Sequence, residues 1–312
     1  MLRTTSPTRP RSLDELLDGP LVAKLNQLDI TSKKVFQGKV KGERRSKRRG
    51  QSVEFADHRQ YVVGDDLRRI DWNIFGRLDR LFLKLFMEEE DLSLHIVVDA
   101  SESMATGEPE KFIFAQKAAA ALAYIGLVNM NRVAVTAIGG NEAEDADPGA
   151  IPTIRNLRGR RRLSEVGSFL TSLDPVGKMR FDAACKRIAL SRQGKGVMVV
   201  LSDFFFKEGY DQGLRYLVGR GYDIVLIQVL SPQEVEPPIG GDLRLRDVED
   251  ADITEVTISA PLLKRYKANL TAYCDQLRDF CARREMVLLT MQSDTPIETL
   301  LLDYLRRRGV LR

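Results

Sequence analysis

Short apolar runs alternate with helical patterns along the chain from residue 91 onward. The runs have the length and composition of strands buried on both faces, and the segments between them have helical spacing. The predicted strands cover 94–98, 133–138, 151–154, 197–201, 224–230 and 286–290. The predicted helices cover 111–128, 163–173, 181–190, 211–220, 261–284 and 297–308, and 243–258 alternates like a hairpin. Repeated strand–helix units predict an α/β domain whose mainly parallel sheet has helices on both faces.

The first 90 residues follow a different pattern. Residues 21–30 have the spacing of a short amphipathic helix, and 81–86 alternate in a way that is typical of a strand. The sequence therefore predicts three parts, which are a flexible lead-in at 1–20, a small β-rich N-terminal element at 21–90 and the main domain at 91–312.

Composition and charge narrow the class of protein. Hydrophobic residues make up 43% of the chain and charged residues 29%, so a normal soluble core can form. The net charge is only +4, which is too small for a nucleic-acid binder that uses the whole chain. The basic residues gather in 33–49, however, and this segment has three interpretations. It could be a solvated loop, a docking surface for an acidic partner, or a contact for nucleic acid or anionic membranes.

Missing sequence patterns argue against disulfide scaffolds, zinc sites, histidine-rich metal sites, P-loop nucleotidases and hydrolases with a G-x-S-x-G nucleophile elbow. The three cysteines contain no C-x-x-C pair, only two histidines exist, and neither a phosphate-binding P-loop nor a G-x-S-x-G elbow occurs. The chain has no uninterrupted apolar run of roughly 18 residues, which a membrane span needs, and its start does not resemble a signal peptide. We therefore expect a cytoplasmic protein without a membrane span.

Acidic and hydroxyl side chains follow two of the predicted strands. Asp99, Ser101 and Ser103 come directly after the first strand, and Asp203 follows the strand at 197–201. The carboxyl ends of parallel strands meet at one edge of a sheet, so these side chains are expected to converge. Carboxylate and hydroxyl oxygens suit Mg²⁺ or Mn²⁺. The alternative is that they cap backbone N–H groups of a strand-to-helix turn.

A longer ordered pattern lies upstream of these strands. It consists of Glu54, Phe55, Arg59, Tyr61, Gly64, Asp65, Asp66, Arg68, Ile70, Asp71 and Trp72. It resembles the signature of domain-of-unknown-function family 58, and the turn at Asp99 resembles the metal-ion-dependent adhesion site of von Willebrand factor A-type domains. The resemblance covers roughly residues 30–310 and implies a von Willebrand A-type, Rossmann-like main domain after a small β element. The charged residues of this pattern are expected to form a structural ion-pair network that pins the β element onto the main domain, in preference to a ligand site, and they are Arg59, Asp65, Asp66, Arg68 and Asp71.

The resemblance also implies a partner and a metal. The expected partners are a MoxR-type AAA ATPase and its client proteins, in the assembly or maturation of other complexes. Asp99, Ser101, Ser103 and Asp203 would bind Mg²⁺. The adhesion site usually takes a threonine from a turn that contains Lys178 here, so the site could be degenerate, with Lys178 or Arg180 supplying the positive charge instead of the metal.

We therefore expect a non-enzymatic interaction module or adaptor. A partner's carboxylate would complete the coordination of the Mg²⁺ ion. The competing hypotheses are a metal-dependent phosphohydrolase, in which Asp203 or Glu102 would act as base or nucleophile, and an electrostatic nucleic-acid binder through 33–49. An aspartyl-phosphate mechanism is disfavoured because Ser101 stands where a second aspartate would be needed.

Overall fold

The computed structural model describes residues 9–32, 55–86, 92–139, 151–177, 180–191, 196–218, 221–239, 241–246 and 253–312. The chain divides into two compact units, of which the main unit comprises 1–37 and 92–312, and the small unit comprises 38–91. The basic segment 33–49, Glu54, Lys178 and the acidic residues within 142–147 lie outside the described residues.

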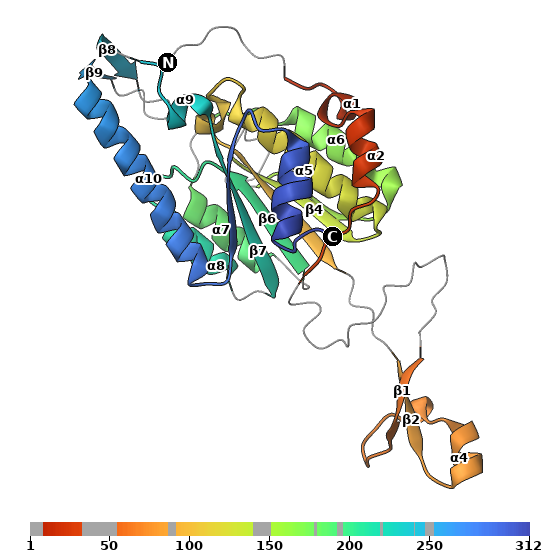
Figure 1. The fold of residues 1–312 in the computed structure, drawn as a ribbon. Helices are drawn as coiled ribbons and strands as arrows, with labels where there is room; N and C mark the ends of the chain where they lie inside the picture. Colours follow the sequence, from red (N-terminus) through yellow and green to blue (C-terminus); the bar gives the residue numbers. More distant parts are fainter. Residues whose placement is uncertain are drawn as a thin grey trace. The chain divides into compact units, whose positions relative to one another are not determined.

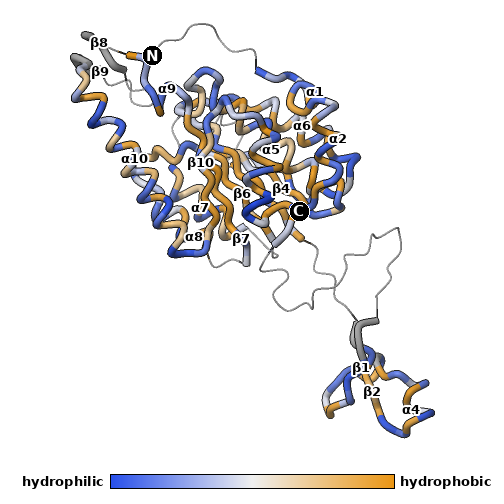
Figure 2. Tube along the Cα trace, viewed as in Figure 1, coloured by the Kyte–Doolittle hydropathy of each residue, from blue (hydrophilic) through white to orange (hydrophobic). Residues whose placement is uncertain are grey.

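A six-stranded sheet forms the centre of the main unit (Figure 1). Its strands run in the order β10-β7-β6-β3-β4-β5, and all neighbours are parallel except β4 and β5. The strands are β3 (Ser93–Ala100), β4 (Arg132–Gly139), β5 (Thr153–Leu157), β6 (Gly196–Ser202), β7 (Tyr222–Leu230) and β10 (Val287–Gln292). Figure 2 shows apolar residues concentrated along these central strands, as expected for a sheet covered on both faces.

Helices cover both faces of this sheet. One layer packs into a core with α1 (Leu13–Leu16), α2 (Gly19–Leu25), α5 (Lys111–Val128), α6 (Leu163–Ser172) and the π-helical η4 (Thr299–Leu305). The opposite layer contains α7 (Phe181–Leu190), α8 (Asp211–Leu217) and α10 (Ala260–Ala282). Short elements complete the unit, namely the 3-10 turns η2 (Glu102–Ala105) and η3 (Arg160–Arg162) and the helix α9 (Pro232–Val235). The prediction of a mixed α/β fold with a mostly parallel, helix-flanked sheet is confirmed, and the fold is consistent with a von Willebrand A-type or Rossmann-like architecture.

Helix α5 lies at the centre of the first layer. Its alanines allow close approach to the sheet, and residues on all its sides are buried, including Phe112, Leu122 and Ile125. By length and composition α5 is apolar enough to cross a membrane, but 83% of its apolar window is buried inside the protein, as in the core helix of a globular domain.

The N-terminal residues contribute to the main core, which differs from the predicted boundaries at 20 and 21. Leu16, Leu21 and Leu25 are buried in the same cluster as the sheet, and Ile30 forms a β-bridge with Leu311. Helices α1 and α2 are too short to be stable alone, so they depend on the packing of these apolar side chains against the main core. Ser12 and Asp18 cap the two helices.

The small unit is built on a β-hairpin. Strands β1 (Phe55–Gln60) and β2 (Phe82–Phe86) pair antiparallel, and the turn η1 (Leu67–Arg69) and helix α4 (Trp72–Leu78) connect them. Asp71 begins α4 by accepting hydrogen bonds from the backbone N–H groups of Asn73 and Ile74. Trp72 contacts Phe75 edge to face, and its surface is 63% exposed.

The predicted hairpin in the second half of the chain also forms. Strands β8 (Gly241–Arg246) and β9 (Ile253–Ile258) pair antiparallel, with Gly241 opposite Ile258 and Arg246 opposite Ile253.

Candidate functional site

Asp99 and Asp203 meet at one edge of the central sheet. Strands β3 and β6 are parallel neighbours, with Val98 opposite Leu201, so the residues that follow them lie side by side. The hydroxyl of Ser202 donates a hydrogen bond to Oδ2 of Asp99 at 2.6 Å. Both aspartates are fully buried. The strand order thus brings together two carboxylates that are 104 positions apart in sequence.

The Asp99 carboxylate lacks a positive neighbour. Its Oδ1 accepts the backbone N–H of Ser101 at 2.9 Å, and its Oδ2 accepts the Ser202 hydroxyl. Among the described residues, no Lys or Arg forms an ion pair with it. Burial, followed by the charge of Asp203, raises the pKa of Asp99 to about 7. A group with this surplus of negative charge attracts a cation or a proton.

Ser101 and Ser103 lie on the turn that follows β3. Their hydroxyl oxygens are 3.0 Å apart, and Ser103 is partly accessible. The loop before α7 is held against this turn, because the Val176 N–H donates to the Ala100 carbonyl and the Glu102 N–H donates to the Gly177 carbonyl. The predicted surrogate cation Lys178 would follow directly but lies outside the described residues, and Arg180 is exposed.

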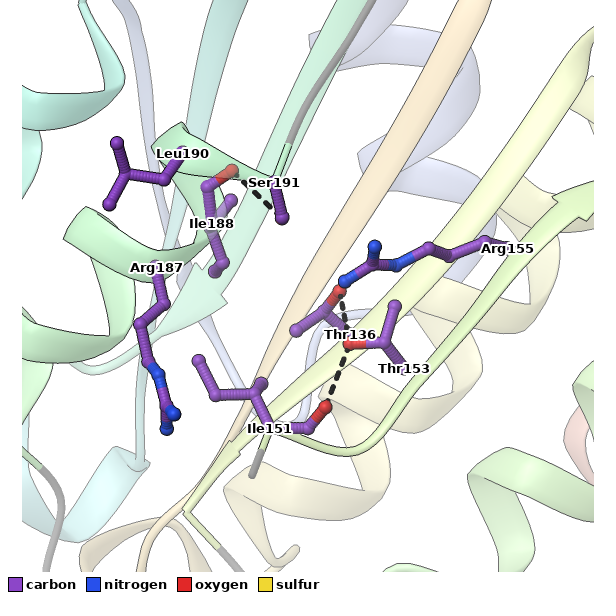
Figure 3. A pocket seen from close by; sticks show the side chains of 8 residues that line it. All are labelled: Thr136, Ile151, Thr153, Arg155, Arg187, Ile188, Leu190 and Ser191. Atoms are coloured by element: carbon purple, nitrogen blue, oxygen red, sulfur yellow. Dashed lines mark hydrogen bonds between the residues drawn. The ribbon is translucent and has the colours of Figure 1, made fainter. Parts of the chain in front are cut away.

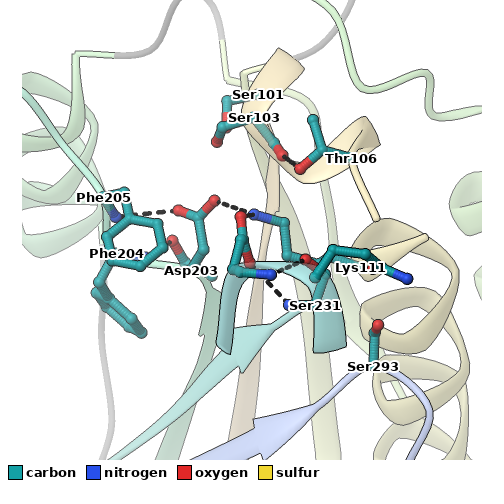
Figure 4. Close-up of polar contacts among 12 residues, drawn as sticks. Ser101, Ser103, Thr106, Lys111, Asp203, Phe204, Phe205, Ser231 and Ser293 are labelled. Carbon is teal, nitrogen blue, oxygen red and sulfur yellow. Dashed lines mark hydrogen bonds and ion pairs between the residues drawn. The ribbon is translucent and has the colours of Figure 1, made fainter. Parts of the chain in front are cut away.

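Lys111 carries the positive charge that the sequence analysis missed. Its ammonium donates to Oδ2 of Asp203 at 2.7 Å and to Oε1 of Glu234 at 2.6 Å, and its side chain is 1% exposed (Figure 4). Burial lowers the pKa of Lys111, but the two carboxylates raise it by more, so this pKa lies above its usual range. Lys111 therefore remains charged and balances Asp203.

The other contacts of Asp203 and Glu234 fix this ion cluster in place. Oδ1 of Asp203 accepts the Phe205 N–H at 3.0 Å. Glu234 and Ser231 form a capping box at the start of α9, in which each side chain accepts the other's backbone N–H. One clue in the sequence pointed to Lys111, since a lysine in the first turn of a helix opposes the helix dipole and needs a nearby anion.

The histidines and cysteines lie elsewhere. His95 is buried in β3 with its Nε2 2.6 Å from Oγ1 of Thr136, and His58 belongs to the small unit. The thiols of Cys185, Cys274 and Cys281 are buried, and burial raises the pKa of each. Within the described ranges, no three or more His, Cys, Asp or Glu side chains form a metal-binding cluster. The candidate site instead combines two carboxylates with two serine hydroxyls.

These features define an α/β protein with an acidic, hydroxyl-bearing site at the carboxyl ends of its parallel strands. The family model for "Protein of unknown function DUF58" matches residues 57–276, so the chain belongs to the DUF58 family. It is 29% identical to "Uncharacterized protein Rv1480" of Mycobacterium tuberculosis, over 81% of this chain and 79% of that protein. It is also 30% identical to "Uncharacterized protein MAV169" of Mycobacterium avium, over 44% of this chain and 82% of that protein.

Solved structures give distant similarity. The conserved hypothetical protein BatB from Bacteroides thetaiotaomicron aligns with 12% identity and a TM-score of 0.40, over 66% of this chain and 91% of that chain. An aerotolerance-related membrane protein from Bacteroides fragilis aligns with 14% identity and a TM-score of 0.41, over 70% of this chain and 96% of that chain.

Proposed function

We propose that this protein is a cytoplasmic binding module without chemistry of its own, which engages a protein partner at the sheet edge around Asp99. The observation that carries the proposal is the Asp99 carboxylate. It is buried beside Asp203, has no cationic partner among the described residues, and lies on the same turn as two hydroxyls. A site of this kind favours a bound cation, to which a partner can add a ligand.

Asp99, Ser101 and Ser103 fit a Mg²⁺ ion. Mg²⁺ prefers oxygen ligands and normally combines one or two carboxylates with several waters. The Asp99 carboxylate accepts hydrogen bonds from the Ser202 hydroxyl and from the Ser101 N–H and hydroxyl. It has about four lone-pair sites, so it can still bind a cation, and the two serine hydroxyls add further oxygens. Asp203 fits less directly because Lys111 already engages its Oδ2. When bound, the ion would supply an open coordination position for a carboxylate of the partner.

The burial and hydrogen bonds of Asp203 favour a binding function for this protein over phosphate-ester hydrolysis. A nucleophile or general base needs a carboxylate that is free to reach the substrate. Asp203 is 0% exposed, and its two oxygens are held by Lys111 and by the Phe205 N–H. This leaves Asp203 suited to a fixed electrostatic role and poorly suited to attack or proton transfer.

The resemblance to von Willebrand A-type proteins of this family suggests which partner to test. A MoxR-type AAA ATPase, or one of its client proteins, would present an acidic side chain to the site. The protein would then act as an adaptor in the assembly or maturation of another complex.

Binding to a purified MoxR-type AAA ATPase from the same organism tests this proposal. The full chain is immobilised, and wild type is compared with Asp99→Asn and Ser103→Ala. Substitutions are preferred to chelation, because the ATPase itself uses Mg²⁺ with its nucleotide. We expect both variants to lose most of the binding, while Ser168→Ala, an exposed serine on α6, keeps it. Full binding by Asp99→Asn contradicts the proposal, and Asp99-dependent hydrolysis of phenyl phosphate would favour the phosphohydrolase.

A further inference from the structure

A cavity with polar and apolar walls lies between the edge strand β5 and the end of α7. It does not include Asp99, although its lining residue Thr136 on β4 pairs with Val97, two residues before Asp99 on β3. It is open to the surface and has a volume of about 400 Å³, enough space for a small molecule. Thr136 of β4 and Thr153 of β5 lie in the wall formed by the sheet, and Ser191 follows α7. Nothing in the proposed adaptor function uses this cavity.

Two arginines reach the cavity from opposite walls. Figure 3 shows Arg155 on the β5 side and Arg187 on the α7 side. Neither guanidinium forms an ion pair or a hydrogen bond with the described residues. The described lining residues include no Asp or Glu, so two positive charges without a partner among the described residues face one space. Arg187 also lies in the last turn of α7, where it offsets the negative end of the helix dipole.

Hydroxyl groups line the floor between the arginines. The Thr153 hydroxyl lies 3.1 Å from Oγ1 of Thr136 and 3.0 Å from the Ile151 carbonyl oxygen. Behind them, the buried His95 contacts the Thr136 hydroxyl at 2.6 Å and fixes its position. Each hydroxyl carries one proton, and Thr153 already donates its proton to Thr136 or Ile151. These oxygens make the wall polar, and the two guanidinium groups supply the donors for an anion.

The remaining wall is apolar. Ile151 and Ile188 line the cavity, and Leu190, which is 68% exposed, stands at its rim. An exposed leucine next to two arginines provides a surface for a ligand that has both an anionic group and an apolar body.

We propose that this cavity binds a small molecule carrying a phosphate monoester, with the phosphate between Arg155 and Arg187 and the organic part against Ile151, Ile188 and Leu190. Guanidinium groups bind phosphate and carboxylate through paired N–H donors. A phosphate monoester carries between about 1.5 and 2 negative charges at pH 7, which matches two arginines better than a single carboxylate does.

Titration calorimetry on the full chain at low ionic strength tests this site, with phenyl phosphate as the probe and benzoate and inorganic phosphate as comparisons. Phenyl phosphate is expected to bind wild type with one-to-one stoichiometry. Arg155→Gln and Arg187→Gln should each weaken binding by about tenfold or more, the loss expected for one charge-assisted contact. The matched control is Arg215→Gln, an exposed arginine on α8, which should leave the affinity unchanged.

The outcomes separate the parts of the proposal. Absence of saturable binding to wild type, or equal affinity in Arg155→Gln and Arg215→Gln, would overturn the site. Benzoate binding as tightly as phenyl phosphate would overturn the phosphate assignment. Inorganic phosphate binding as tightly as phenyl phosphate would show that the apolar wall contributes nothing. Both arginine substitutions are on the surface, and circular dichroism verifies that the variants are folded.

Discussion

Asp99 in the main unit and Asp71 in the small unit form the same local turn but have opposite electrostatic surroundings. Each carboxylate accepts a backbone N–H from two residues further along the chain, at 2.9 Å in both cases. The Asp71 carboxylate also lies 3.0 Å from Nε2 of His58 and 3.4 Å from Nζ of Lys84. Asp99 has instead a second carboxylate, Asp203, as its charged neighbour.

The pKa values follow these surroundings. The hydrogen bond from His58, together with the backbone N–H groups and Lys84, lowers the pKa of Asp71 to about 2. Burial and Asp203 raise the pKa of Asp99 to about 7. The comparison shows that a turn sequence alone does not reveal a site. A capping aspartate is structural when cations neutralise it, and becomes a candidate binding group when the fold buries it beside another acid.

Removing Lys111 should have the largest effect, because it would leave Asp203 as unbalanced as Asp99. Lys111→Met deletes the buried ammonium and leaves the carboxylates of Asp203 and Glu234 without their cationic partner. Breaking a buried ion pair in this way costs about 3–5 kcal/mol of unfolding free energy. Urea denaturation at pH 7.5 measures this. Lys117→Met, on the same helix, is the control, with a change expected within about 0.5 kcal/mol. Equal stability of the two variants would show that Lys111 does not balance the site.

Neutralising Asp99 should change how stability depends on pH. The folded chain keeps the Asp99 proton up to about pH 7, whereas the unfolded chain releases it near 3.8. Binding of this proton stabilises the folded state. The stabilisation is complete below pH 3.8 and is lost as the pH rises toward 7. The loss amounts to at most about 4 kcal/mol.

Asp99→Asn removes this dependence and should be more stable than wild type at pH 8. Its amide can keep both hydrogen bonds, since its oxygen accepts the Ser101 N–H and its nitrogen donates to the Ser202 hydroxyl. Urea denaturation in the presence of a chelator, between pH 4 and pH 8, measures the slope of unfolding free energy against pH. Asp303→Asn, an exposed substitution on η4, serves as the control and should keep the slope of wild type. The same slope in Asp99→Asn would mean that another group titrates.

The contribution of Asp71 to stability should depend on pH in the opposite direction to that of Asp99, and it should be smaller. Its lowered pKa stabilises the small unit above pH 3.8, and this stabilisation is lost as the pH falls toward 2. Trp72, the only tryptophan in the chain, is adjacent, so its fluorescence reports on this unit. We expect an acid transition that weakens or disappears in Asp71→Asn and persists in Asp79→Asn, which alters an exposed carboxylate at the end of α4. An unchanged transition in Asp71→Asn would remove the contrast with Asp99.

The alternating strands and helices of the main unit were predictable from sequence, because each apolar run had to be buried between two helical layers. The convergence of Asp99 and Asp203 was also predictable, since both follow parallel strands. The role of Lys111 was not, because it depends on α9 bringing Glu234 to the same point from 123 residues away. The packing of Leu16 and Leu21 on the main core was missed for the same reason, since a short amphipathic segment does not reveal which surface it covers. The arginine cavity combines β5 with the end of α7, and neither segment carries a recognisable motif.

Mg²⁺ titration of the full chain by calorimetry at pH 8 determines whether Asp99, Ser101 and Ser103 form a cation site. At this pH Asp99 is ionised. We expect that wild type binds one Mg²⁺ with modest affinity, that Ser103→Ala binds it more weakly, and that Asp99→Asn does not bind it, although this variant is folded and at least as stable. Absence of Mg²⁺ uptake by wild type, or equal uptake by Asp99→Asn, would contradict the proposed cation site.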